Sequence, residues 1–171
     1  MFLDLSRIRR AQDCFERTIQ PSELSQDDVY RVVAPVELAF DIHKDRDLFR
    51  LVGTVRSELE LPCSRCLEPF RMPVHAAFDQ RYLPQAGVAA EGEAEVSEID
   101  LETSFYLDEQ IDLDELVREQ FYLSLPMKPL CWEQCKGLCS QCGTNLNLGS
   151  CDCAPAWEDP RLAPLKGLKR T

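Results

Sequence analysis

Three stretches of the chain alternate between apolar and polar residues with a period of two, which is typical of half-buried β-strands. Their apolar positions are Val36, Leu38, Phe40 and Ile42 in the first, Phe49, Leu51, Val55, Leu59 and Leu61 in the second, and Phe70, Met72, Val74, Ala76, Phe78 and Tyr82 in the third. Gly53 falls in phase with the second stretch and predicts a bulge or bend there. Because the polar joint at 45–47 is short, the stretches are predicted to form neighbouring antiparallel strands of a meander.

Two prolines and one short apolar run add detail to this meander. Pro35 and Pro73 lie in the outer two stretches. Proline donates no backbone hydrogen bond, so both residues favour edge positions or strand irregularities. Residues 103–107, Thr-Ser-Phe-Tyr-Leu, could return as one more strand.

The clearest helix signal begins after Asp112. Asp112 and Glu115 have the spacing of a capping box, with an acid in place of the usual hydroxyl. A stripe with spacings of three and four follows, made of Leu113, Leu116, Val117, Gln120, Phe121 and Ser124. Since Pro126 cannot continue a helix, the helix is predicted over 113–124.

The excess of acid is concentrated in one segment. The formal net charge is −11, and residues 84–125 contain 12 acidic residues against one basic residue, Arg118. Residues 84–98 contain few bulky apolar residues and are predicted to form an acidic loop. A chain this acidic repels nucleic-acid phosphates at long range, so the charge argues against a simple RNA clamp.

The nine cysteines indicate metal chemistry. The start of the chain lacks the pattern of a signal peptide and no apolar run is long enough to span a bilayer, so we expect a cytoplasmic protein with reduced thiols. Eight of the cysteines form four close pairs: Cys63/Cys66, Cys131/Cys135, Cys139/Cys142 and Cys151/Cys153. Two thiolates so close in sequence can hold one side of a tetrahedral ion, and zinc accepts four of them without redox chemistry. Two structural zinc ions are therefore predicted.

The partition of the pairs is less determined than the ligands themselves. The strongest local site joins Cys139/Cys142 to Cys151/Cys153 across a short, turn-prone loop, which leaves Cys63/Cys66 with Cys131/Cys135. An alternative lets Cys131/Cys135 share an ion with Cys139/Cys142. An iron–sulfur cluster is disfavoured because the spacings do not resemble those of ferredoxins.

Other candidate residues have simpler interpretations. A thioredoxin-like role for Cys63 and Cys66 is disfavoured because the pair is followed by a strand rather than a helix. His43 and His75 are interpreted as polar surface residues, and Cys14 as a partly buried thiol. Arg65 could contact a phosphate or pair with a nearby acid. The tryptophans that flank the cysteine-rich segment, Trp132 and Trp157, are interpreted as packing residues.

These elements predict an α+β fold that is mainly β. An antiparallel meander with one principal helix and an acidic loop precedes a C-terminal cysteine-rich zinc knob. The predicted domains are a β core over 1–125 and a zinc-binding segment with a tail over 126–171.

The chain also resembles a known family. The run Cys63-Ser-Arg-Cys66-Leu-Glu-Pro-Phe70 is similar to the Cys-x-Arg-Cys-x-x-x-Phe signature of the bacterial YceD family of large ribosomal RNA subunit accumulation proteins. The later runs 135–147, 151–153 and 159–165 fit the same family, so the resemblance covers about residues 30–168.

The resemblance implies a role in ribosome biogenesis and no known catalytic activity. With the acidic charge, it leads us to expect a non-enzymatic accessory factor that contacts a protein partner, for which a basic ribosomal protein is a candidate. Direct RNA contact is left open, and no membrane association is expected. The alternatives are a zinc-binding adaptor or regulator unrelated to ribosomes and, third, a thiol redox protein.

Overall fold

The computed structural model describes residues 1–24, 27–85, 103–153 and 161. The chain divides into two compact units. The first comprises Met1–Leu61 and Phe70–Met127, and the second comprises Pro62–Pro69 and Lys128–Thr171. The second unit therefore combines two segments that lie far apart in the sequence.

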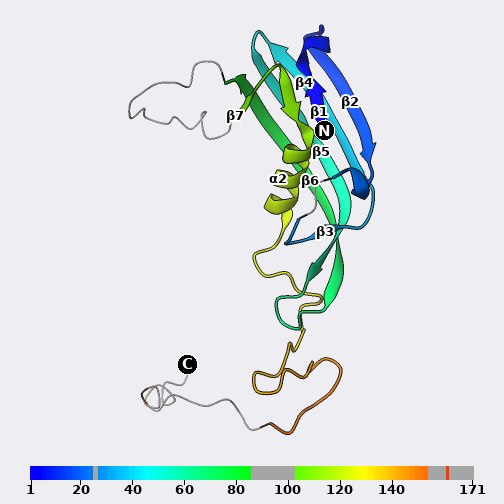
Figure 1. Ribbon diagram of the computed structural model, residues 1–171, viewed down its shortest axis with the longest axis vertical. Coiled ribbons are helices and arrows are strands. Elements are labelled where there is room, and N and C mark those ends of the chain that lie inside the picture. The colour runs from blue at the N-terminus through cyan, green and yellow to red at the C-terminus, as the bar shows by residue number, and fades with distance from the viewer. Residues whose placement is uncertain (25–26, 86–102, 154–160, 162–171) are drawn as a thin grey trace, which may run out of the picture. The chain divides into compact units, whose positions relative to one another are not determined.

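A six-stranded mixed sheet forms the body of the first unit (Figure 1). Its strands follow the order β2 (Gln12–Ile19), β4 (Val36–Asp45), β5 (Leu48–Pro62), β6 (Pro69–Pro84) and β7 (Thr103–Tyr106), and β3 (Arg31–Val32) pairs with β5. A separate two-stranded sheet pairs β1 (Phe2–Asp4) with β8 (Gln110–Asp112). Two short 3-10 turns span Leu5–Arg7 and Pro21–Glu23, and the α-helix α2 spans Leu113–Ser124.

The three alternating stretches are confirmed as β4, β5 and β6. Their apolar positions face the core, and only Phe70 and Met72 are partly rather than fully buried. The joint at 45–47 is a tight turn in which Arg46 has a φ of 55°. The antiparallel ladder between β4 and β5 pairs Asp45 with Leu48 at the turn and continues to the pair Glu37 and Arg56.

Gly53 is explained by a close approach of two strands. It lies opposite Phe40 in an unbroken ladder, so it does not form a bulge. A Cβ atom at Gly53 would lie 2.2 Å from the carbonyl oxygen of Ala39 and 2.3 Å from the Cβ of Phe40. Only the absence of a side chain lets β5 pack this closely against β4.

The sheet is wider than the predicted meander. The edge position expected for the Pro35 stretch is wrong, because β2 pairs with β4 from Val36 to His43; Pro35 itself lies just before β4. β7 pairs with β6 only from Arg81 to Pro84, which does not reach Pro73. The β2 strand was not predicted from the sequence, because seven of its eight residues are exposed or only partly buried and its apolar and polar residues do not alternate clearly. The strand expected at 103–107 is confirmed as β7, but it pairs parallel to β6.

The helix has the predicted bounds and packs on the sheet through the predicted face. The carboxylate of Asp112 accepts a hydrogen bond from the Asp114 amide at 2.9 Å, which satisfies one of the free N–H groups at the helix start. Five residues of the stripe are buried, namely Leu113, Leu116, Val117, Gln120 and Phe121, whereas Ser124 is half-buried. The four apolar members of this set belong to the same buried cluster as the strand residues.

The predicted acidic loop at 84–98 lies outside the described residues from position 86 onward. Within the part of the chain that the structure describes, no helix has the length and apolar character needed to cross a membrane.

The close approach at Gly53 gives a test of the sheet. Gly53→Ala should lower the free energy of unfolding by about 1–3 kcal/mol, because the added methyl group overlaps backbone atoms that cannot move aside. Gly149→Ala is the control, since a Cβ there meets no atom within 4 Å. Urea unfolding of both variants gives the comparison, and a Gly53→Ala protein as stable as the control would contradict the packing described for β4 and β5.

Candidate metal centres

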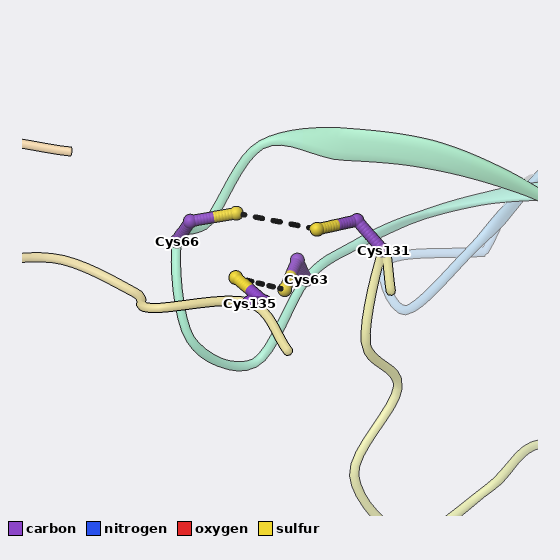
Figure 2. A group of neighbouring side chains, drawn as sticks. All are labelled: Cys63, Cys66, Cys131 and Cys135. Atoms are coloured by element: carbon purple, nitrogen blue, oxygen red, sulfur yellow. Dashed lines mark hydrogen bonds between the residues drawn. The ribbon is translucent and has the colours of Figure 1, made fainter. Parts of the chain in front are cut away.

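The first cysteine group joins the two segments of the second unit. Cys63 and Cys66 lie on the loop that connects β5 to β6, and Cys131 and Cys135 lie on the segment that follows α2. Figure 2 shows the four side chains pointing toward one another. The sulfurs of Cys63 and Cys135 are 3.8 Å apart, as are those of Cys66 and Cys131.

The second group lies wholly within the C-terminal segment. Cys139, Cys142, Cys151 and Cys153 also bring their sulfurs within 4.8 Å of one another. Each predicted ligand thus falls in one of two groups of four, and the partition is the one favoured from the spacing. The two groups differ in exposure: three cysteines of the first are buried, whereas the second contains two exposed and two half-buried residues.

The donor sets fit tetrahedral metal ions. Four sulfurs placed about 2.3 Å from a tetrahedral zinc lie about 3.8 Å from one another. The two measured separations in the first group have this value. Either group can therefore hold a metal ion.

Two of the cysteine pairs use the same backbone turn. In each, the N–H of the third residue approaches the first sulfur: Arg65 to Cys63 at 3.5 Å, and Gln141 to Cys139 at 3.4 Å. In each, the residue after the second cysteine donates its N–H to the carbonyl of the first, at 2.9 Å. We call these two turns the knuckles, 63–67 and 139–143.

The final residue of each knuckle adopts a left-handed conformation. Gly143 has a φ of 74° and Leu67 a φ of 62°. Glycine meets this requirement without strain, whereas a leucine side chain does not. Leu67 gains little from burial in return, because 64% of its surface is exposed.

Hydrogen-bond donors favour the ionised form of a thiol in each group. Burial opposes ionisation of Cys63, but the backbone N–H groups of Cys66, Cys131 and Arg65 together lower its pKa to about 6. The hydroxyl and backbone N–H of Thr144 act in the same direction on Cys142 and lower its pKa to about 6. Because a metal binds the thiolate, the surroundings of these two thiols favour ligation, whereas burial raises the pKa of Cys131 to about 12 and the hydrogen bond with Cys142 raises that of Cys153 to about 12.

Arg65 contacts the backbone of the opposite segment. Its guanidinium donates hydrogen bonds to the carbonyl oxygens of Glu133 at 3.2 Å and Cys135 at 2.8 Å. Its own carbonyl accepts from the N–H of Leu138 at 3.1 Å. The sequence interpretation of Arg65 as a phosphate contact or an ion pair missed this role, which joins the two segments that carry the first group.

The second unit has little else to hold it together. Among its described residues, the buried hydrophobic side chains are those of Cys63, Cys66 and Cys135, with no aliphatic or aromatic residue among them. A segment without an apolar core depends on cross-links for its stability. The two cysteine groups are the evident candidates for such cross-links.

The remaining candidates lie elsewhere or belong to the surface. His43 and His75 are exposed on β4 and β6, as expected. The prediction for Cys14 is wrong: it is exposed on β2, because the inward positions of that strand belong to its neighbours. Trp132 is 48% exposed, and Trp157 lies outside the described residues.

One polar residue near the first group was not singled out from the sequence. The side-chain amide of Asn147 donates to the sulfur of Cys135 at 3.2 Å, although Asn147 belongs to the loop of the second group. The sequence offers two signals for it: Asn147 stands between Leu146 and Leu148, and it ends the run 135–147 that fits the family.

Comparison with known proteins agrees with the resemblance noted in the sequence. The family model described as large ribosomal RNA subunit accumulation protein YceD matches residues 51–169. The chain is 29% identical over 157 residues to a maize protein named large ribosomal RNA subunit accumulation protein YCED homolog 1, chloroplastic, covering 78% of this chain and 53% of that one. The Arabidopsis thaliana protein of the same name is 26% identical over 156 residues, covering 79% and 49%.

Shorter similarity extends to bacteria. An uncharacterised protein of Mycobacterium bovis is 35% identical over 98 residues, which cover 56% of this chain and 44% of the relative. The chain spans about half the length of the curated relatives it matches. No solved structure matches.

The left-handed residues of the knuckles generate a reciprocal prediction. Gly143→Leu should lower the free energy of local opening at its knuckle by about 1–2 kcal/mol, because a side chain is forced into the left-handed region. Leu67→Gly should leave local stability unchanged or raise it by up to about 1 kcal/mol, since relief of that strain exceeds the entropic cost of glycine. Amide exchange of residues 67 and 143, whose N–H groups close the two knuckles, measures both effects.

The control for Leu67→Gly is Leu148→Gly, which removes another exposed leucine that has no positive φ. Its free energy of opening should fall slightly, by about 0.5–1 kcal/mol, because glycine only adds entropy to the unfolded chain. If Leu67→Gly lowered the free energy of local opening as much as this control or more, strain at the left-handed residue would not determine the stability of the knuckle.

Proposed function

This chain belongs to the YceD family, and we propose that it is a non-enzymatic accessory factor of ribosome assembly that supports the accumulation or processing of large-subunit ribosomal RNA. The observation that carries the proposal is the family match over residues 51–169, which includes both cysteine groups. The names of the maize and Arabidopsis relatives support a ribosome-related role. We propose a cytoplasmic location for this protein.

We propose zinc as the metal and a structural role for it. Four thiolates per group match the preference of structural zinc. A catalytic zinc keeps one position open for water or substrate, whereas four protein ligands fill the tetrahedral shell. The donor set therefore supports a protein that binds partners rather than one that performs chemistry.

The charge of the described residues supports a basic protein as the partner. Residues 103–125 contain six acidic residues and one basic residue. Four of those acids are exposed, namely Asp108, Glu109, Glu115 and Glu119. Such a surface attracts a basic ribosomal protein and repels RNA phosphates, so the proposed action on ribosomal RNA is indirect.

The metal proposal predicts two zinc ions per chain. Elemental analysis of protein purified without added metal should give close to two, and Cys139→Ser should reduce this toward one while the sheet of the first unit stays folded. Cys139→Ser should also destabilise the C-terminal segment strongly, because the binding free energy of structural zinc is about 10–16 kcal/mol in zinc-finger peptides. Folded protein with a zinc content near zero would contradict the proposal.

The functional proposal predicts that depleting the protein lowers large-subunit ribosomal RNA relative to small-subunit ribosomal RNA. Re-expression of the wild type should restore the ratio. A variant with Asp108→Asn, Glu109→Gln, Glu115→Gln and Glu119→Gln should restore it poorly, because the loss of steering charge slows association with a basic partner.

The matched control removes four acidic charges from two strands of the sheet instead. It combines Asp13→Asn and Glu16→Gln on β2 with Glu37→Gln and Asp41→Asn on β4, all exposed. This control should restore the ratio as well as the wild type does. An unchanged ratio after depletion would instead favour a zinc-binding adaptor or a thiol redox protein unrelated to ribosomes, and equal rescue by both charge variants would remove the basic partner from the proposal.

A further inference from the structure

The two cysteine groups are connected by a short antiparallel ladder. Segment 136–139 runs from the first group to the second, and segment 144–147 runs back beside it. The N–H of Cys139 donates to the carbonyl of Thr144 at 2.8 Å, Leu138 and Asn145 form a β-bridge, and the N–H of Leu146 donates to the carbonyl of Gly137 at 2.9 Å. The ladder thus begins at the knuckle of the second group and ends beside the first.

The last position of the ladder is Asn147. Its side-chain oxygen accepts from the N–H of Lys136 at 2.8 Å, and its side-chain nitrogen donates to the sulfur of Cys135 at 3.2 Å. Asn145 fixes this orientation, because its side-chain oxygen accepts from both the backbone N–H and the side-chain amide of Asn147, each at 3.0 Å. The amide of Asn147 is therefore aimed at a metal-ligating sulfur by three other hydrogen bonds.

The sulfur of Cys135, which accepts this hydrogen bond, has few other donors within reach. Cys135 is only 2% exposed, so water has little access to its sulfur. Four thiolates around a divalent ion leave two uncompensated negative charges, which buried surroundings tolerate only if N–H groups donate to the sulfurs. The other donor to this sulfur is the backbone N–H of Gly137. Removing the Asn147 amide would leave the Cys135 sulfur with that donor alone, and water could not take the place of the lost one.

The position of Asn147 is linked to the second group through its loop. The loop leaves the second group at Cys142 and returns to it at Cys151. When the second group holds a metal, both ends of the loop are fixed, so the cost of ordering it is already met. When that group is empty, the loop is anchored by the ladder and by the hydrogen bond from the Asn145 amide to Glu68 at 3.5 Å. The free-energy cost of ordering Asn147 against Cys135 is then offset by these contacts and the first group, without the second.

We propose that the two metal centres load cooperatively, and that Asn147 is the positioning residue through which the second centre raises the metal affinity of the first. By linkage, a metal in the first centre raises the affinity of the second by the same factor. The inference rests on the metal ligation proposed above. The C-terminal loop is then more than a second zinc site, since its closure completes the hydrogen bonding of the first.

The test is a double-mutant cycle on the full chain with zinc as the probe. The four proteins are the wild type, Asn147→Ala, Cys139→Ser/Cys142→Ser, and the triple variant. Each is equilibrated with a graded zinc chelator and then exposed to a brief pulse of an alkylating reagent. Mass spectrometry of the peptides that contain Cys63, Cys66, Cys131 and Cys135 reports the occupancy of the first centre alone.

Both Asn147→Ala and Cys139→Ser/Cys142→Ser should weaken zinc binding at the first centre about 10–100-fold, the usual effect of removing a hydrogen bond to a metal ligand. The triple variant should be no weaker than either, because both changes remove the same contact. Gln141→Ala is the matched control: its backbone N–H, and not its side chain, contacts a sulfur, so the first centre should be unaffected.

Cobalt(II) substitution adds a readout that loss of folding alone would not mimic. Asn147→Ala should shift the sulfur-to-cobalt charge-transfer bands of the first centre in the wild-type background but not in the Cys139→Ser/Cys142→Ser background. The coupling would be overturned if the fold-losses in zinc affinity multiplied in the triple variant. It would also be overturned if Cys139→Ser/Cys142→Ser left the zinc affinity of the first centre unchanged. Those outcomes differ from failure of the metal proposal itself, in which the wild type would retain no zinc.

Discussion

One constraint shapes the second unit: eight of its thiols lie close together in two groups of four, and its described residues include no buried aliphatic or aromatic side chain, so we propose that a bound cation holds each group. The sulfurs of the first group are paired at 3.8 Å, and three of the four cysteines are buried. Ionised thiolates at such distances repel one another strongly in a buried site. In the proposed centre, a divalent ion would turn this repulsion into attraction and would join the loop between β5 and β6 to the segment that follows α2.

Several local features fit the proposed cross-link. The knuckles at 63–67 and 139–143 turn their backbone N–H groups toward sulfur, and each accepts a left-handed residue to do so. Arg65 then spans the gap between the segments by donating to two carbonyl groups. The same arrangement fits the proposed function, because four protein ligands would leave no open position on the metal, and the exposed acids Asp108, Glu109, Glu115 and Glu119 would attract the proposed basic partner.

The features that could be predicted from the sequence are those with a regular pattern, and the features that were missed depend on single contacts. The alternation of β4, β5 and β6, the span of α2 and both cysteine groups follow from periodicity and spacing, which the chain displays openly. The edge strand β2 could not be found this way, since it buries too little to alternate. The hydrogen bond from Asn147 to Cys135 was equally hidden, because a side-chain contact across 12 positions depends on a ladder that only the folded chain reveals.

X-ray absorption at the zinc edge of the purified protein tests the central claim most directly, because it reads the atoms around the metal itself. The account predicts about four sulfur neighbours per zinc at about 2.3 Å, averaged over both centres. A shell with two or fewer sulfurs, completed by nitrogen or oxygen, would show that the two cysteine groups do not hold the metal and would contradict the account.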